Sequence, residues 1–261
     1  MVNIKDVWQE IKSQVVLQSE KEPFLASYFH SSIIGHDDLG AALSYMLANQ
    51  LGDSNMPAIT LREVIQTAYA KHPKLVECAG FDICAVKERD PAIDQCATVL
   101  LYLKGYKALQ AHRISHCLWK NDRRALALYL QSRVSETYGV DIHPAATIGK
   151  GVMFDHASGI VVGETCVIED NVSILQSVTL GGTGNENGDR HPKIRQGVMI
   201  GAGAKVLGNI EIGEGAKIGS GSVVLSPVAP HTTVVGIPAR VVGSPSSSMP
   251  ALDMEQNVLK D

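Results

Sequence analysis

A six-residue period in the second half of the chain limits its possible folds more than any other feature. From Ile142 an apolar side chain returns every six positions as far as Val178, and after one interruption the period runs from Ile194 to Val224. This period fits neither an α-helix nor a flat hairpin, whereas it fits a parallel β-helix in which each hexapeptide forms one side of a coil. Most of the 24 glycines also lie beyond residue 139, as short strands separated by tight corners require.

The first half of the chain follows a helical pattern. Apolar residues recur there at helical spacing, and residues that favour helix N-termini separate the stretches. Asp38, Thr60 and Asp90 each precede an apolar stretch as a helix N-cap would, and a proline follows Asp90. We expect about six to eight helices, the last over residues 122–137.

The two patterns predict an α+β multidomain fold, in which an α-helical domain is followed by a parallel β-helix with one extruded loop. We expect the helical domain over residues 1–139, the β-helix over 140–243 and a flexible C-terminal tail over 244–261. The tail is expected to be flexible because its Ser- and Pro-rich start offers few apolar anchors.

Composition and charge exclude several classes of function. The net charge of the 261 residues is −4 without any Lys/Arg run, which gives no reason to expect nucleic acid or an anionic membrane as a partner. No apolar run reaches a membrane-spanning length. The 5 cysteines form no CxxC pair and no secretory signal is apparent, so a reducing, cytoplasmic location is predicted.

The interruption of the period is the first candidate site, because solenoids carry function where their coils are interrupted. Ten additional residues, 184–193, leave the repeat there and include Arg190 next to His191. A guanidinium can bind a carboxylate through two parallel hydrogen bonds, so the loop is a candidate carboxylate site. A solvated loop without a ligand is the alternative.

Phe154-Asp155-His156 is the second candidate. An alcohol must lose its proton as it attacks, and histidine is the side chain whose pKa suits this task near neutral pH. Asp141 stands fifteen residues before His156, less than a full coil, so stacking alone does not bring the two together. A corner or a neighbouring subunit would have to do so, and a purely structural histidine is the alternative.

Several stretches resemble the serine O-acetyltransferase family. They are residues 141–165, 177–184, 189–194 and 236–240, and with an Arg-Asp-Pro-Ala motif in the helical half the resemblance covers nearly all of residues 20–243. Hexapeptide repeats are shared with galactoside, maltose and xenobiotic acetyltransferases, and the large helical half narrows the choice. The resemblance implies a left-handed coil of three sides, in which residues about 18 apart stack.

The resemblance also implies roles for individual residues. His156 is expected to be the general base and Asp141 its orienting partner, in a direct transfer of acetyl from acetyl-CoA to the hydroxyl of L-serine. No covalent enzyme intermediate and no metal are expected. The implied serine contacts are Asp90 and Asp155 for the ammonium group, and Arg190 and His191 for the carboxylate. Acetyl-CoA lies between neighbouring β-helices in this family, and the implied lining residues are Gly182, Ala202, Ala204 and Lys217.

The implied partners follow from the same family. Three β-helices are expected to associate side by side with active sites between them, and two trimers to join through the helical domains into a homo-hexamer. L-Cysteine, which carries SH in place of OH, is expected to inhibit by competition with serine. The family's C-terminal tail binds O-acetylserine sulfhydrylase through a terminal isoleucine, and this chain departs from that pattern because it ends in Asp261.

Two rival functions come from other classes. Zinc-dependent carbonic anhydrases also use hexapeptide β-helices, and the chain offers four histidines for a metal, namely His143, His156, His191 and His231. Zinc needs about three imidazoles that converge on one point, which the wide spacing of these residues along the repeat disfavours. The other rival is a scaffold or regulator of a partner protein, for which the sequence offers only the C-terminal tail.

Overall fold

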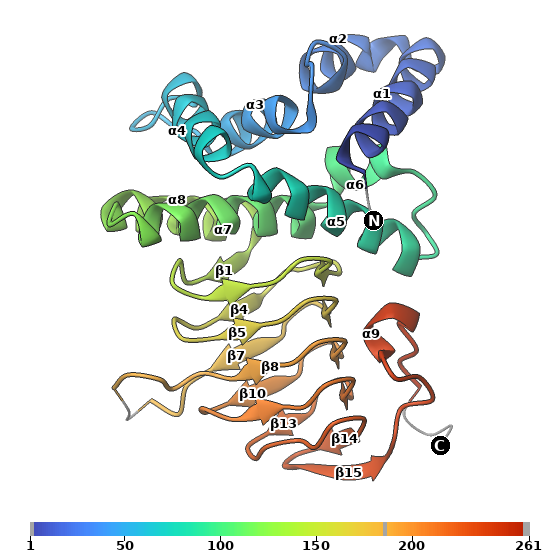
Figure 1. The fold of residues 1–261 in the computed structure, drawn as a ribbon, viewed down its shortest axis with the longest axis vertical. Coiled ribbons are helices and arrows are strands. Elements are labelled where there is room, and N and C mark those ends of the chain that lie inside the picture. The colour runs from blue at the N-terminus through green and yellow to red at the C-terminus, as the bar shows by residue number, and fades with distance from the viewer. Residues whose placement is uncertain (1–2, 185–186, 258–261) are drawn as a thin grey trace.

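A computed structural model describes residues 3–184 and 187–257, and it shows a layer of helices packed on one end of a β-helix (Figure 1). The last four residues, on which the sulfhydrylase expectation depends, and residues 185–186 of the predicted loop lie outside the described residues. Within the described ranges no helix is long and apolar enough to cross a bilayer. The helices before the β-helix are α1 (Ile4–Lys21), α2 (Ala26–Phe29), α3 (Leu39–Leu51), α4 (Ala58–Lys71), α5 (Lys74–Arg89), α6 (Cys96–Tyr102), α7 (Lys104–Lys120) and α8 (Arg124–Tyr138), with a 3₁₀ segment at Pro23–Leu25 and a π segment at His30–Ile34.

Of the three predicted helix starts, one is confirmed and two are wrong. Asp38 is the N-cap of α3, where its carboxylate accepts a hydrogen bond from a first-turn amide at 2.8 Å. Helix α4 begins two residues before Thr60. Asp90 follows the end of α5, and its carboxylate accepts a hydrogen bond from Ala92 N at 2.9 Å. This aspartate therefore builds a turn after one helix and does not start the next.

The β-helix is a prism with three parallel sheets, named A, B and C in the order in which the chain visits them. Sheet A contains β1 (Val140–Ile142), β4 (Ile160–Val162), β7 (Thr179–Gly181), β10 (Lys205–Leu207) and β13 (Val223–Val224). Sheet B contains β2 (Thr147–Ile148), β5 (Val167–Ile168), β8 (Lys193–Ile194) and β11 (Glu211–Ile212). Sheet C contains β3 (Met153–Phe154), β6 (Ser173–Ile174), β9 (Met199–Ile200), β12 (Lys217–Ile218), β14 (Thr233–Gly236) and the antiparallel β15 (Ala239–Gly243). Buried Ile, Val and Leu side chains fill the prism.

The register differs from the expected spacing in the first coil. Phe154 stacks on Ile174, twenty residues later, whereas Val162 stacks on Leu180 after the expected eighteen. The two additional residues lie in the turn after Phe154, which is the turn that holds His156. Over residues 142–224, the span of the predicted period, the β-helix therefore has two interruptions and not the single one predicted. The second is the loop between β7 and β8, which lengthens its coil to twenty-six residues, so it adds eight residues and not ten.

A buried ion pair joins the helical part to the first coil. Arg113 of α7 donates to the Asp82 carboxylate of α5 at 2.7 Å, and both side chains are buried. The same guanidinium donates to the Ile148 and Gly149 carbonyls, while Asp82 accepts a hydrogen bond from Val152 N. Because the buried charges are paired and hydrogen-bonded, they fix α5 and α7 against the β-helix.

The C-terminal segment was expected to be a flexible tail, whereas the structure packs residues 249–254 against sheet C. The short helix α9 (Pro250–Asp253) buries Ala251 completely. Ala251 N donates to the Gly197 carbonyl, and its own carbonyl accepts a hydrogen bond from the Ser173 hydroxyl at 2.7 Å. A single small anchor leaves no periodic signal in the sequence, which is why the pattern did not indicate this contact.

Candidate active site

His156 lies in the turn between β3 and β4, where the chain passes from sheet C to sheet A. Its imidazole is 74% exposed, so a substrate can reach it. His156 and Ala157 have φ values of +53° and +64°, which cost a non-glycine residue free energy and persist only with support from the surroundings. Ala157 is fully buried, and a Cβ on Gly105 of α7 would lie 2.2 Å from the Phe154 carbonyl oxygen. The first turn of α7 therefore packs directly against the turn of the candidate base.

One carboxylate lies beside this imidazole, and a second acts on the first. Asp155 Oδ1 is 3.8 Å from His156 Nε2, and Asp90, at the end of α5, is close enough to act on Asp155 electrostatically. Burial raises the pKa of Asp155, the charge of His156 opposes this rise, and the negative charge of Asp90 adds to it. Two carboxylates that repel each other in this way favour a cation between them.

Asp141 does not pair with His156 within one chain. It is the middle residue of β1, between the buried Val140 and Ile142, so its side chain faces outward from sheet A. Its carboxylate accepts a hydrogen bond from Gln131 Nε2 at 2.6 Å. In the part of the chain that the structure describes, no hydrogen bond or ion pair joins Asp141 to His156.

Arg190 and His191 lie at the other edge of sheet A, in the loop that projects from the prism after β7 (Figure 1). The Thr165 hydroxyl accepts hydrogen bonds from the backbone N–H groups of Arg190 and His191, at 3.0 and 3.1 Å. Thr165 N donates to His191 Nδ1 at 3.2 Å, which leaves the proton of a neutral imidazole on Nε2. Burial lowers the pKa of His191 and so favours this neutral form. The loop thus presents one guanidinium and one imidazole N–H donor.

Glu164 and Thr165 are the residues of this site that the sequence motifs did not single out. Glu164 accepts a hydrogen bond from Arg190 Nη2 at 2.8 Å, so it orients the guanidinium. Gly163 leaves room for the loop, because a Cβ there would lie 2.0 Å from the His191 ring. The only sequence signal was their place in a stretch that resembles the family, since no spacing rule says how an extruded loop returns to the corner.

The structure therefore brings the candidate residues together in two groups. Asp90, Asp155 and His156 lie where sheet C meets sheet A, whereas Arg190 and His191 lie where sheet A meets sheet B. The strands of sheet A that separate the groups span roughly 10 Å at the usual rise per residue. One small amino acid cannot bridge that distance and contact both groups of the same chain.

The residues expected to line an acetyl-CoA groove are also separated. Ala202 is half-buried at the corner between sheets C and A, while Gly182 lies beside Arg190 at the corner between A and B. Ala204 is fully buried, so only its backbone can face a groove. Lys217 is buried on sheet C, where its Nζ donates to the Asn257 carbonyl at 2.9 Å.

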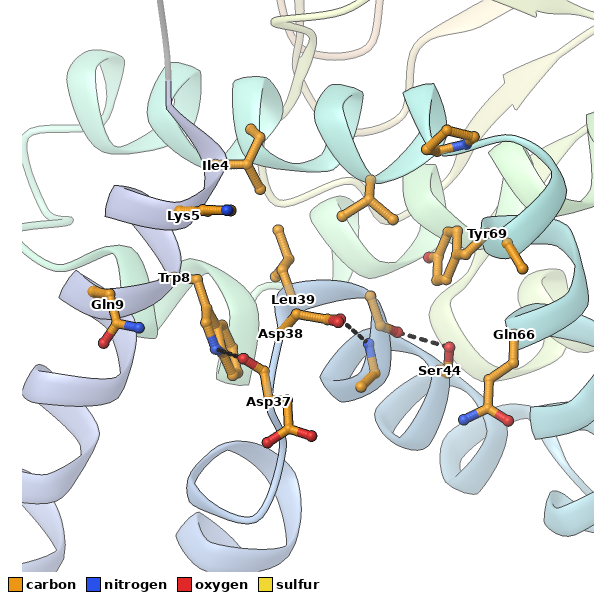
Figure 2. A pocket seen from close by; sticks show the side chains of 15 residues that line it. Ile4, Lys5, Trp8, Gln9, Asp37, Asp38, Leu39, Ser44, Gln66 and Tyr69 are labelled. Atoms are coloured by element: carbon orange, nitrogen blue, oxygen red, sulfur yellow. Dashed lines mark hydrogen bonds between the residues drawn. The ribbon is translucent and has the colours of Figure 1, made fainter.

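A cavity of about 610 Å³ lies in the helical part and contains none of these residues (Figure 2). Trp8, Leu39 and Tyr69 are among its apolar lining residues, and Lys5 and Asp37 are among the charged ones. The Trp8 indole N–H donates to the Asp37 carbonyl at 2.8 Å. The cavity lies between α1, α3, α4 and the start of α5, and it is separate from the candidate active site.

The rival zinc function requires a cluster of metal ligands. Among residues 3–184 and 187–257, no group of three or more His, Cys, Asp or Glu side chains is arranged to hold a metal ion. The geometry required for a zinc site is three or four ligands around one point.

Known protein families match both parts of the chain. The family model "Serine acetyltransferase, N-terminal" matches residues 7–111, and "Bacterial transferase hexapeptide (six repeats)" matches residues 191–226. A serine acetyltransferase of Salmonella typhimurium is 62% identical over 251 residues, which are 96% of this chain and 92% of that protein.

Solved structures give the same result. The crystal structure of serine acetyltransferase from Vibrio cholerae matches with a TM-score of 0.97 and 61% identity, over 98% of this chain and 99% of that one. A serine acetyltransferase in complex with cysteine matches with a TM-score of 0.96 and 59% identity, over 98% and 99% of the two chains. A complex with CoA matches with a TM-score of 0.89 and 59% identity, over 92% of this chain and 100% of that one.

Proposed function

The chain belongs to the serine acetyltransferase family, and from that premise we propose that His156 is the general base of its reaction. The enzyme is an acyltransferase that moves the acetyl group of acetyl-CoA to the hydroxyl of L-serine. The products are O-acetyl-L-serine and CoA, and the reaction is the first step from serine to cysteine. Identity of 62% over 96% of the chain supports this activity.

The mechanism that we propose is direct transfer. As the serine oxygen attacks the thioester carbonyl carbon, His156 takes the hydroxyl proton, and a tetrahedral intermediate forms. The carbon–sulfur bond then breaks, the thiolate of CoA leaves, and the imidazolium returns the proton to sulfur. The exposed imidazole supports this role, because a substrate can reach the ring. The backbone of its turn has positive φ values and packs against the first turn of α7.

The observation that carries the serine specificity is the carboxylate pair beside His156. The negative charge of Asp90 raises the free energy of the charged form of Asp155, and an ammonium group bound between the two carboxylates would relieve the repulsion. We assign the serine carboxylate to Arg190 and the Nε2–H of His191, which offer charge and a directed donor. With its ammonium and carboxylate groups bound in this way, serine would direct its third substituent, the hydroxymethyl group, towards His156.

Because the two groups lie at opposite edges of sheet A, we propose that each active site forms between two copies of the chain. One copy provides the edge with His156, and its neighbour provides the edge with Arg190. The outward position of Asp141 on sheet A supports the same arrangement, since a neighbour's His156 can reach an exposed strand. Three copies with cyclic symmetry close this heterologous contact. We propose that the helical parts then join two such trimers into a hexamer.

The acetyl-CoA groove is proposed at the same interface. Ala202 stands at the His156 edge, and Gly182 of the neighbour stands at the Arg190 edge, so the two approach each other in the trimer. Ala204 would contribute only its backbone, and Lys217, which is buried on sheet C, would reach the groove by exchanging the Asn257 carbonyl for CoA. L-Cysteine differs from serine by SH in place of OH, and we expect it to inhibit in the same site, in competition with serine.

Two further expectations remain proposals. A cytoplasmic location is supported by 5 free cysteines in the described residues. A contact with O-acetylserine sulfhydrylase depends on the chain's last residues, which lie outside the described residues. Addition of a peptide with the sequence of residues 252–261 to that enzyme tests the contact, because a bound tail would inhibit it.

Replacement of the general base tests the proposed function. His156→Ala is expected to lower turnover by roughly 10²- to 10⁴-fold, the usual contribution of general-base catalysis. His231→Ala is the matched control, because His231 is also exposed and also has a positive φ, of +52°, at the far end of the β-helix. The measurement is thiol release from acetyl-CoA with serine as acceptor. Full turnover of His156→Ala would contradict the assignment.

A further inference from the structure

Arg89, the last residue of α5, is a buried cation. Its side chain is 6% exposed, and within the described residues it takes part in no salt bridge. Its Nε, also buried, has no hydrogen-bond partner in that part of the chain. Burial lowers the pKa of Arg89 to about 10, which still leaves it charged at neutral pH. A charge kept in such a position destabilises the fold, so a different reason for its presence is needed.

Within the described residues, both side-chain hydrogen bonds of Arg89 go to the β-helix. Nη1 donates to the Ser173 hydroxyl at 3.1 Å, and Nη2 donates to Asn171 Oδ1 at 3.5 Å. Ser173 is fully buried in β6, so this hydroxyl is a fixed point of the prism. The guanidinium therefore fastens the C-terminal end of α5 to one strand of sheet C.

The same strand also holds Asp155. Strand β6 of the second coil pairs with β3 of the first coil. Just after β3, Asp155 N donates to the Ile174 carbonyl of β6 at 2.9 Å. Ile174 is the residue after Ser173, and Asp90 is the residue after Arg89. One side of the proposed ammonium site is thus attached to Ser173 through Arg89, and the other side is attached to the next residue of the same strand.

We propose that Arg89 is a positioning residue for serine binding, because it sets Asp90 at a fixed separation from Asp155. It does not touch the substrate. The separation matters because two carboxylates bind one ammonium group well only when both reach it, and their mutual repulsion drives them apart. The inference rests on the proposed function, and it assigns to the helical part a role in recognition of the amino acid.

A double-mutant cycle on the hexamer tests the inference. Arg89→Gln and Ser173→Ala each remove the contact, and each is expected to raise the KM for serine by roughly tenfold. The KM of the double variant for serine is expected to be no higher than that of the more impaired single variant, because both changes remove the same contact. Ser173 also donates to the Ala251 carbonyl, but that loss occurs on both sides of the cycle and cancels. The KM for acetyl-CoA and the thermal midpoint are measured in parallel.

Two controls distinguish positioning from a structural role. Arg195→Gln removes an arginine that is paired with Glu169 and Glu211 on the surface, and it is expected to leave the KM for serine unchanged. Arg89→Lys retains the charge with a single donor group and is expected to restore part of the serine affinity. If Arg89→Gln does not fold, Arg89→Lys replaces it in the cycle, because Ser173→Ala alone would also remove the hydrogen bond to the Ala251 carbonyl.

An unchanged KM for serine in both single variants would overturn the inference. So would additive effects in the double variant, or a loss that appears only in the thermal midpoint. Failure of the proposed function is recognised separately, because the unaltered protein would then release no thiol from acetyl-CoA with serine.

Discussion

Substitution of Gly105 tests whether the helical part controls the catalytic base. Gly105 is in the first turn of α7, and a Cβ built on it would lie 2.2 Å from the Phe154 carbonyl oxygen and 2.9 Å from Ala157 Cβ. The first of these neighbours is backbone of the residue two before His156. It cannot rotate away as the end of a flexible side chain would, so Gly105→Ala must move α7 and the His156 turn apart.

The size of the effect follows from these distances. Ordinary contact begins near 3.4 Å, so the Phe154 carbonyl and the new methyl group must separate by a further ångström or so. A displacement of about 1 Å at a catalytic group can cost around 100-fold in rate. Overpacking costs about 1–3 kcal/mol of unfolding free energy, and the better helix propensity of alanine returns up to about 1 kcal/mol. We therefore expect a large loss of kcat with only a small loss of stability.

Thiol release from acetyl-CoA at saturating serine measures kcat, and thermal denaturation measures stability. Gly40→Ala is the matched control, because Gly40 also lies at a helix start. The three nearest atoms to its Cβ would all be side-chain atoms, Val76 Cγ2 at 3.2 Å, Asp38 Oδ1 at 3.3 Å and Tyr69 Cδ2 at 3.7 Å. This control is expected to retain nearly full kcat. If Gly105→Ala kept its kcat within a factor of about two, the position of His156 would not depend on α7, and the argument from backbone strain would be refuted.

Three other predictions concern single contacts. Gly163→Ala should displace the His191 ring, because the new Cβ would lie 2.0 Å from it. The KM for serine should rise while the KM for acetyl-CoA changes little, and equal changes in the two KM values would contradict the prediction. Asp82→Ala should lower the unfolding free energy by about 3–5 kcal/mol, because it leaves the buried Arg113 without its partner, and a denaturation midpoint within error of the unaltered protein would argue against that. Burial holds the pKa of His112 well below 6.5, so below this pH the unfolded chain binds a proton at His112 that the folded chain does not. The contribution of His112 to the unfolding free energy should therefore decrease as the pH is lowered, with a limiting slope of about 1.4 kcal/mol per pH unit. His112→Gln should make the unfolding free energy less dependent on pH between about pH 6.5 and 5.5, as measured by urea titrations.

The sequence predicted the architecture well because the apolar period is a direct consequence of the coil. It placed the register of the first coil wrongly for a physical reason. Each side of the prism buries two residues two positions apart, as with Val172 and Ile174, so a six-residue count fits either one. The two additional residues near His156 were therefore invisible to the period, although they form the turn that exposes the imidazole.

The candidate residues were found largely through the family resemblance. Their division into two groups at opposite edges of sheet A was not predicted from the sequence. The neighbourhood of Asp90 and Asp155 depends on where α5 ends relative to β3, and no local pattern encodes that contact between two parts of the fold. The roles of Thr165 and Arg89 depend on individual hydrogen bonds across a coil or across the interface with the helices. Such contacts are set by tertiary packing, and a single sequence carries no separate signal for them.

The division of the candidate residues between the two edges of sheet A has a consequence for inheritance. In the proposed trimer a copy altered at His156 still offers an intact Arg190 edge to its neighbour, and a copy altered at Arg190 still offers an intact His156 edge. Two inactive alleles of these types, expressed in one cell, would assemble mixed trimers in which some sites are whole. A copy damaged at both edges would instead spoil the sites on either side of it, so the active fraction would fall as the square of the intact share, and the defect would be partly dominant.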